Sequence, residues 1–175
     1  TDGTNRTIFD RTSSVCFSVL SNPESAVKNW QWSSPRRIAD GIMMNKPTVL
    51  SSGEWLFPIA VWQTDIYPNF RKGGLKDDEK AGSYVYKSSD NGKTFVCMGM
   101  ADIRNRSFDE HMVLELTNGV LKMYVRTKYG IGISHSYDRG KTWSTGEDSK
   151  LGGPCSRFFI RRLKSGRILL INHID

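Results

Sequence analysis

SSDNGKTF at residues 88–95 returns as SYDRGKTW at residues 136–143, and both fit the pattern S-x-D-x-G-K-T-aromatic. The Asp of such a turn accepts hydrogen bonds from backbone N–H groups that follow it, and the Gly supplies positive φ. The two glycines, Gly92 and Gly140, lie 48 positions apart (140 minus 92). This distance is close to the ~40–50 residues of one propeller blade. The octapeptides therefore predict two tight turns, one structural repeat apart.

A second kind of turn alternates with the octapeptides. Three apolar hairpins with a polar, Gly-containing turn occupy residues 49–56, 115–121 and 162–169. Apolar runs on both sides of such a turn are typical of paired β-strands. Because the two kinds of turn alternate, the sequence predicts four-stranded antiparallel meanders, with the octapeptide joining strands three and four.

These turns divide the chain into blades of a single all-β domain, 1–175. We expect a half blade at 12–39, whole blades at 45–103 and 110–146, and a half blade at 157–174. The two whole blades would begin with strands at 45 and 110, and the second would end with a strand at 142–146. Closed propellers have four to eight blades. The sequence therefore predicts an incomplete β-propeller of roughly three blade-equivalents, which further blades or another chain would complete.

The composition limits the possible partners. Lys and Arg number 25 against 18 Asp and Glu, a net charge of +7, which favours anionic partners or simply a solvated basic surface. No run approaches the ~20 apolar residues of a membrane span. The three cysteines and three histidines show no metal-ligand spacing, so we expect no metal or cofactor. A polar insertion at residues 63–81 is a candidate functional loop or a plain surface insertion.

The two octapeptides resemble the Asp-boxes of sialidases, the neuraminidase-like BNR-repeat propellers. The stretch from Glu110 to Arg126 resembles a sialidase segment in which a Glu opens an innermost strand and an Arg closes the second. The resemblance implies a six-bladed fold, with Glu110 as base partner of a tyrosine nucleophile and Arg126 as a clamp for the substrate carboxylate. The alternatives are a solvated acidic pair for Asp109 and Glu110, and an edge ion pair for Arg126.

Other sialidase residues are matched less well. Where sialidases have Arg-Ile-Pro, this chain has Asn45-Lys46-Pro47, and a Lys cannot imitate the bidentate guanidinium fork. The resemblance places the general acid on an Asp in the following loop. The candidates are Asp65, Asp77 and Asp78.

The remaining sialidase positions fall towards the C-terminus. The tyrosine nucleophile and a third arginine would lie beyond Asp175. His173, with Asn172, is a candidate for the rim of the site. Strand pairs are antiparallel, so we expect Glu110 and Arg126, with Asn45 and Asp65, to gather on one rim.

Three functions remain open. The first is a retaining exo-glycosidase that acts on acidic or modified sugars of glycans. The second is a lyase of uronate-containing glycans, with Arg126 neutralising a carboxylate and Tyr124 or Tyr129 and a His as base. The third is a non-catalytic carbohydrate-binding propeller. In each case the expected partner is an acidic glycan rather than nucleic acid, and the resemblance implies a secreted or periplasmic location.

Overall fold

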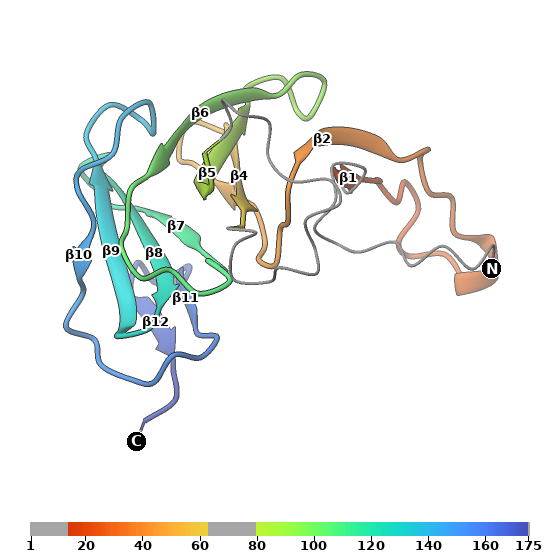
Figure 1. Cartoon of the computed structure of the whole chain (residues 1–175). Coiled ribbons are helices and arrows are strands. Elements are labelled where there is room, and N and C mark those ends of the chain that lie inside the picture. Colours follow the sequence, from red (N-terminus) through yellow and green to blue (C-terminus); the bar gives the residue numbers. More distant parts are fainter. Residues whose placement is uncertain (1–13, 63–79, 175) are drawn as a thin grey trace, which may run out of the picture.

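The computed structural model describes residues 14–62 and 80–174, which form four antiparallel β-sheets that follow one another in chain order (Figure 1). The first sheet has β1 (Ser14–Phe17) and β2 (Arg36–Asp40). The second has β3 (Thr48–Val49), β4 (Trp55–Val61), β5 (Gly82–Ser88) and β6 (Val96–Ala101). The third has β7 (Met112–Glu115), β8 (Leu121–Thr127), β9 (Gly130–Ser136) and β10 (Glu147–Asp148). The fourth has β11 (Phe159–Arg162) and β12 (Ile168–Ile171).

Helix is limited to one short 3-10 turn, η1 (Val27–Asn29), in the described residues. Each four-stranded sheet is a meander in which neighbouring strands pair in sequence order. The prediction of an all-β, incomplete propeller with four-stranded antiparallel blades is therefore confirmed. Within the same residues no helix has the length and apolar character needed to cross a membrane.

The sheets pack face to face through three apolar clusters. Side chains alternate along a strand, so successive residues of β8 serve two different interfaces. Leu121, Met123 and Val125 face the second sheet, where they join Leu56 and Val85 in one buried cluster. Facing the other way, Tyr124 packs with Met112, Ile133, Phe158 and Ile160 against the fourth sheet. A smaller cluster of Ala39, Phe57 and Ile59 joins the first sheet to the second.

The octapeptide turns close through their aspartates. Asp90 Oδ1 accepts hydrogen bonds from the N–H groups of Lys93 and Thr94, and Oδ2 accepts one from the Thr94 hydroxyl. Asp138 accepts equivalent bonds from the N–H and hydroxyl of Thr142. Hydrogen bonding to the charged form lowers a carboxyl pKa. The Thr bonds accordingly lower the pKa of each aspartate to about 2.

Three predicted strand positions are wrong. The inner strands begin at Thr48 and Met112 rather than at 45 and 110. Pro47 has no N–H to give to a ladder. Residues 108–110 have positive φ, which is incompatible with a strand. The fourth strand of the third sheet lies at Glu147–Asp148 instead of 142–146. Ser144 bonds to Ser134 and His135 of β9 partly through its own hydroxyl, which replaces a regular backbone ladder there.

Candidate active site

A left-handed turn precedes the inner strand of the third sheet. Phe108, Asp109 and Glu110 have φ values of 56°, 49° and 43°, a conformation that is unusual for one non-Gly residue and more so for three in a row. Such backbone is retained where the surroundings fix it, and it is concentrated at functional sites. Here the Arg126 N–H donates to the Asp109 carbonyl at 2.9 Å, and the Trp62 indole donates to the Phe108 carbonyl at 2.9 Å.

The turn sends its two carboxylates in different directions. Asp109, only 2% exposed, points into the protein, where Arg106 donates to both of its oxygens at 2.8 and 2.9 Å. Arg106 also donates to the Ala81 carbonyl at 3.0 Å, which joins the turn to the second sheet. Burial raises the pKa of Asp109, although Arg106 opposes that rise. Asp109 is thus a buried anchor, and Glu110 is the carboxylate that reaches the rim.

Glu110 forms an ion pair with Arg126 from the end of β8. The Arg126 Nη1 donates to Glu110 Oε2 at 3.1 Å, and Nη2 donates to the Cys155 carbonyl at 3.0 Å. The guanidinium lies over the Phe108 ring, 5.3 Å from its centroid. Burial would lower the pKa of Arg126, but the bonds to Cys155 and Glu110 outweigh it and raise that pKa. Arg126 therefore remains charged, although its side chain is only 19% exposed.

Asn45 ties the second sheet to this turn. Its Nδ2 donates to the Glu110 carbonyl at 2.6 Å and to the His111 carbonyl at 3.3 Å. Its Oδ1 accepts a hydrogen bond from Arg157 Nη2 at 3.2 Å, and the same nitrogen donates to the Met44 carbonyl. Since the amide of Asn45 is used on both sides, its contacts hold Glu110 in position.

The contacts form a closed ring across three sheets. The ring runs from Arg126 to Glu110, through Asn45 to Arg157, and back along the chain to Cys155, which accepts from Arg126. Each side chain precedes or ends a strand at the same end of its sheet. The structure thus brings three of the sequence-predicted residues, Asn45, Glu110 and Arg126, together at one rim.

The other predicted residues are placed differently. Lys46 is exposed and lies next to Asn45. His173 is exposed after β12, and the described residues give it no hydrogen bond or ion pair to Glu110 or Arg126. Asp65, Asp77 and Asp78 lie outside the described residues.

His111 is a buried packing residue rather than part of the exposed site. It is 2% exposed, and its Nε2 lies 2.7 Å from the Tyr84 carbonyl. Burial lowers the pKa of His111 to about 4. It is therefore neutral at physiological pH.

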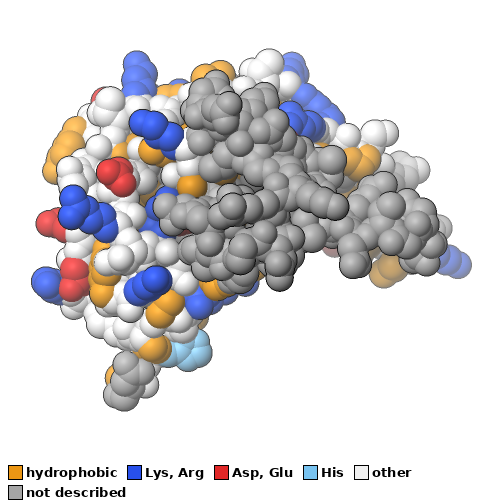
Figure 2. Space-filling view, in the orientation of Figure 1, with side chains coloured by type: hydrophobic (Ala, Val, Ile, Leu, Met, Phe, Trp, Pro, Cys, Tyr) orange, Lys and Arg blue, Asp and Glu red, His pale blue; other side chains and the backbone are white. Residues whose placement is uncertain are grey.

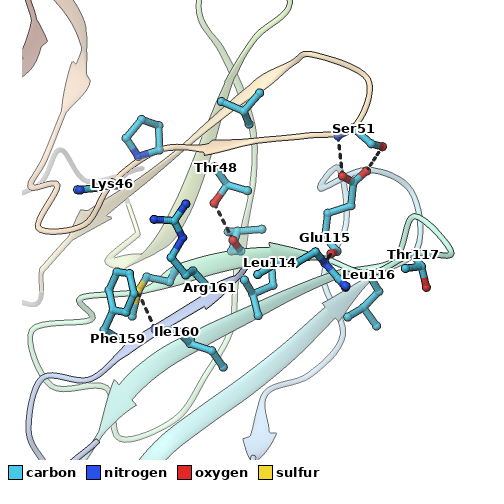
Figure 3. Close-up of a pocket in the computed structure, with 15 residues that line it drawn as sticks. Lys46, Thr48, Ser51, Leu114, Glu115, Leu116, Thr117, Phe159, Ile160 and Arg161 are labelled. Carbon is cyan, nitrogen blue, oxygen red and sulfur yellow. Dashed lines mark hydrogen bonds between the residues drawn. The ribbon is translucent and has the colours of Figure 1, made fainter. Parts of the chain in front are cut away.

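A groove runs from this rim along the inner strands. It has a volume of about 460 Å³ and is lined by β3, β7 and β11 together with flanking residues. Figure 3 shows Arg161 projecting from β11 towards β3, with Lys46 at one end of the groove and Ser51 and Thr117 at the other. The three strands run in the same direction. Thr48 contacts Val113 and Ser51 contacts Glu115, and in the same sense Ile160 contacts Met112 and Arg162 contacts Glu115. One end of the groove thus lies at Lys46, the residue that follows Asn45 of the ring.

Arg157 is the residue of the ring that the sequence reasoning missed. The sequence signal for Arg157 is its distance from the inner strand of its blade. Arg157 stands two residues before the inner strand β11, as Glu110 stands two residues before β7. Residues at equivalent positions of successive blades lie side by side around a propeller, so the repeat could have indicated it.

The BNR repeat-like domain model matches residues 12–174 of the chain. A search of curated protein sequences gives no match.

Three solved structures share the fold at 19% sequence identity. A protein of unknown function from Dyadobacter fermentans has a TM-score of 0.60, with 79% of this chain and 40% of that one covered. The Hadza microbial sialidase Hz136 has a TM-score of 0.58, with 83% and 29% covered. The leech intramolecular trans-sialidase has a TM-score of 0.53, with 83% and 22% covered.

The chain therefore spans less than half the length of these structures, and at this identity the likeness shows the fold alone. The repeat pattern, the antiparallel blades and the match over residues 12–174 agree. The chain belongs to the BNR repeat-like domain family and has a sialidase-like propeller fold.

Proposed function

We propose that the protein is a sialidase-like retaining exo-glycosidase that acts on acidic or modified sugars of glycans. The observation that carries this proposal is the Glu110–Arg126 pair, joined at 3.1 Å beside the groove along the inner strands. A carboxylate and a guanidinium held at one rim supply a proton acceptor and a group that binds anions.

The pair has capacity left for a substrate. A guanidinium carries five N–H donors, and within the described residues Arg126 uses one Nη1–H on Glu110 and one Nη2–H on Cys155. Its Nε is buried, so the second N–H of each terminal nitrogen is what remains for a substrate. Glu110 accepts one side-chain hydrogen bond there, at Oε2, so Oε1 is available as a proton acceptor. The strained turn fixes the direction of Glu110 before a substrate arrives, which lowers the cost of arranging the site.

In the proposed mechanism, Glu110 takes the proton of a tyrosine nucleophile carried by a further blade. The nucleophile attacks the anomeric carbon, and an aspartic acid protonates the departing glycosidic oxygen. Asp65 and Asp78 are the candidates for that acid. Water then hydrolyses the covalent intermediate, and the two displacements retain the configuration of the sugar. Arg126 holds Glu110 in place and contributes its remaining N–H donors to the binding of the acidic group of the sugar.

The lyase alternative is supported less well. Tyr124 lies in the buried cluster between the third and fourth sheets, where burial raises the pKa of its phenol. His111 is buried against the Tyr84 carbonyl. Neither group is placed to remove a proton from a sugar at the rim. Tyr129, the other candidate tyrosine, is 37% exposed in the turn after β8, but burial raises the pKa of its phenol and so disfavours the phenolate that would act as base. We therefore favour hydrolysis. A secreted or periplasmic location, where acidic glycans are met, is part of this proposal.

The test is the release of 4-methylumbelliferone from its α-sialoside by the purified protein. Replacing Glu110→Gln keeps the size of the side chain and removes its basicity. We expect kcat to fall by about 10²- to 10⁴-fold, the usual contribution of a general acid or base. Glu147→Gln is the matched control, because Glu147 is 69% exposed on β10, and we expect it to keep the wild-type rate.

Each alternative has its own outcome. A wild-type rate for Glu110→Gln would remove Glu110 from the mechanism. An unsaturated uronide product, seen by its ultraviolet absorbance, would identify a lyase. Binding of an acidic sugar without any product would identify a carbohydrate-binding protein.

A further inference from the structure

We propose that Arg157 is the principal cation for the anionic group of the substrate, a sugar carboxylate such as that of a sialic or uronic acid. This inference deepens the proposed function and rests on it. It assigns to Arg157 a binding and specificity role that complements the Glu110–Arg126 pair.

The charge balance of the site supports this assignment. Arg126 is paired with Glu110 at 3.1 Å, and Arg106 is paired with Asp109 at 2.8 Å. Arg157 forms no ion pair with a carboxylate of the described residues, and it is exposed. The attraction of a paired guanidinium for a further anion is largely cancelled by its partner. Among the arginines of the ring, an incoming carboxylate is therefore drawn more strongly to Arg157 than to Arg126.

The guanidinium of Arg157 is also held in place. Its Nη2 donates to the Met44 carbonyl and to Asn45 Oδ1, so its position is fixed by a neighbouring blade. Its Nε and Nη1 make no hydrogen bond with any described residue. A planar fork that is oriented but still has free donors suits a carboxylate, and less ordering is needed when the ligand binds.

The location matches that of the proposed reacting group. Asn45 contacts both Arg157 and the backbone of Glu110, so a single amide separates the Arg157 guanidinium from the proposed base. The exposed Lys46 follows Asn45 and lies at the entrance of the groove. A sugar with its carboxylate on Arg157 and its ring towards Glu110 would avoid direct repulsion between the two carboxylates.

The probe is N-acetylneuraminate, compared with its uncharged methyl ester, titrated into the wild-type protein and followed by NMR of the arginine Nε–H signals. We expect the acid to shift the Arg157 signal and the ester to bind more weakly. Arg157→Gln should weaken binding of the acid by about 10- to 100-fold, as expected for a charged hydrogen-bonding group. Arg157→Lys should recover part of the loss, since it restores the charge without the fork.

Arg167→Gln is the matched control. It removes the same charge from an exposed position in the turn between β11 and β12, at the opposite end of the fourth sheet from Arg157. We expect it to leave the affinity for the acid unchanged and thereby exclude an effect of net charge. Thermal melts of each variant separate loss of binding from loss of folding.

The outcomes separate this inference from the proposed function. Wild-type affinity in Arg157→Gln, with the affinity lost in Arg126→Gln, would overturn the role of Arg157 and leave the proposed function standing. A shift of the Arg157 signal without hydrolysis of the sialoside would support the binding role of Arg157 and overturn the proposed hydrolysis. Absence of both binding and hydrolysis would overturn both.

Discussion

Asp109 and Glu110 are neighbours in the turn before β7, and they have different roles. In an extended strand their side chains would point to the two faces of the sheet. With positive φ, the buried Asp109 anchors the turn through Arg106, and Glu110, 9% exposed, meets Arg126 at the rim. The cost of the strained backbone is offset by charge-assisted hydrogen bonds, which are stronger than neutral ones. The turn is therefore stable only with its arginines.

His111 makes the stability of the protein depend on pH. Its pKa is about 4 in the folded state, against 6.5 for a solvated imidazole, because burial disfavours the charged form. The unfolded chain therefore binds more protons between these values. Stability is fully present above pH 6.5 and falls as the pH drops towards 4, by roughly 3 kcal/mol in total.

Replacing His111→Gln tests this dependence. The amide can still donate to the Tyr84 carbonyl but does not titrate. We expect its free energy of unfolding, measured by urea titration, to vary less steeply between pH 6.5 and 4, by up to about 1.4 kcal/mol per pH unit. Parallel curves for the two proteins would show that His111 is not the group responsible.

At the scale of the elements, close backbone approach joins one blade to the next. Gly99 on β6 has φ of 147°, and a Cβ built there would lie 2.7 Å from the Lys141 carbonyl oxygen in the octapeptide turn of the third sheet. That oxygen is backbone and cannot swing away. The turn and β6 therefore pack at a distance that only Gly permits.

Gly99→Ala should destabilise the protein more than Gly119→Ala does. Gly119 also has positive φ, 80°, but a Cβ there would meet nothing within 4 Å. The Gly119 variant therefore measures backbone strain alone, about 1–2 kcal/mol. Overpacking against Lys141 should add about 1–3 kcal/mol in the Gly99 variant. Equal free energies of unfolding in the two variants would show that the sheets can move apart without cost.

The turns were predictable from sequence because their interactions are local. Asp90 and Asp138 bond within four residues of themselves, so the octapeptides contain their own partners. The starts of the inner strands were predicted too early, because the turn at 108–110 depends on Arg126 and Trp62, which are distant in sequence. Local propensity carries no signal of such contacts.

The candidate site was predictable in part for the same reason. The contact between Glu110 and Arg126 follows from antiparallel pairing within one hairpin. The ring through Asn45 and Arg157 depends on packing between sheets, with partners 112 residues apart in the sequence. No pattern along one strand reports such a distance, although the blade repeat does relate Arg157 to Glu110.

At the scale of the molecule, the second, third and fourth sheets are joined by more than apolar packing. Glu115 accepts bonds from the N–H and hydroxyl of Ser51, and its carbonyl accepts one from Arg162. Thr48 donates to the Val113 carbonyl at 2.7 Å. Inner strands of three sheets are thus held together at β7. Lys and Arg side chains are dispersed over the described surface visible in Figure 2 rather than gathered in one patch.

The first sheet has weaker support. Its strands are mostly exposed or half-buried, with Ala39 as the buried apolar residue that packs on Phe57 and Ile59. A charged contact to the second sheet is the bond from Arg36 to the Lys93 carbonyl, and the Arg36 guanidinium also lies over the ring of Phe17. In repeat architectures stability is a sum of repeat and interface contributions. The first sheet should therefore open before the others do.

Hydrogen exchange measured in the native state tests this order of opening. The amides of β8, a strand paired on both sides and buried along most of its length, should exchange only through global unfolding. Those of β1 and β2 should exchange at a lower free energy, through a local opening that leaves the third sheet intact. Adding N-acetylneuraminate should increase the protection of Glu110 and its neighbours but not that of β1 and β2. Equal protection of β2 and β8 would show that the four sheets unfold as one unit, and that the contacts between the first and second sheets are stronger than their burial indicates.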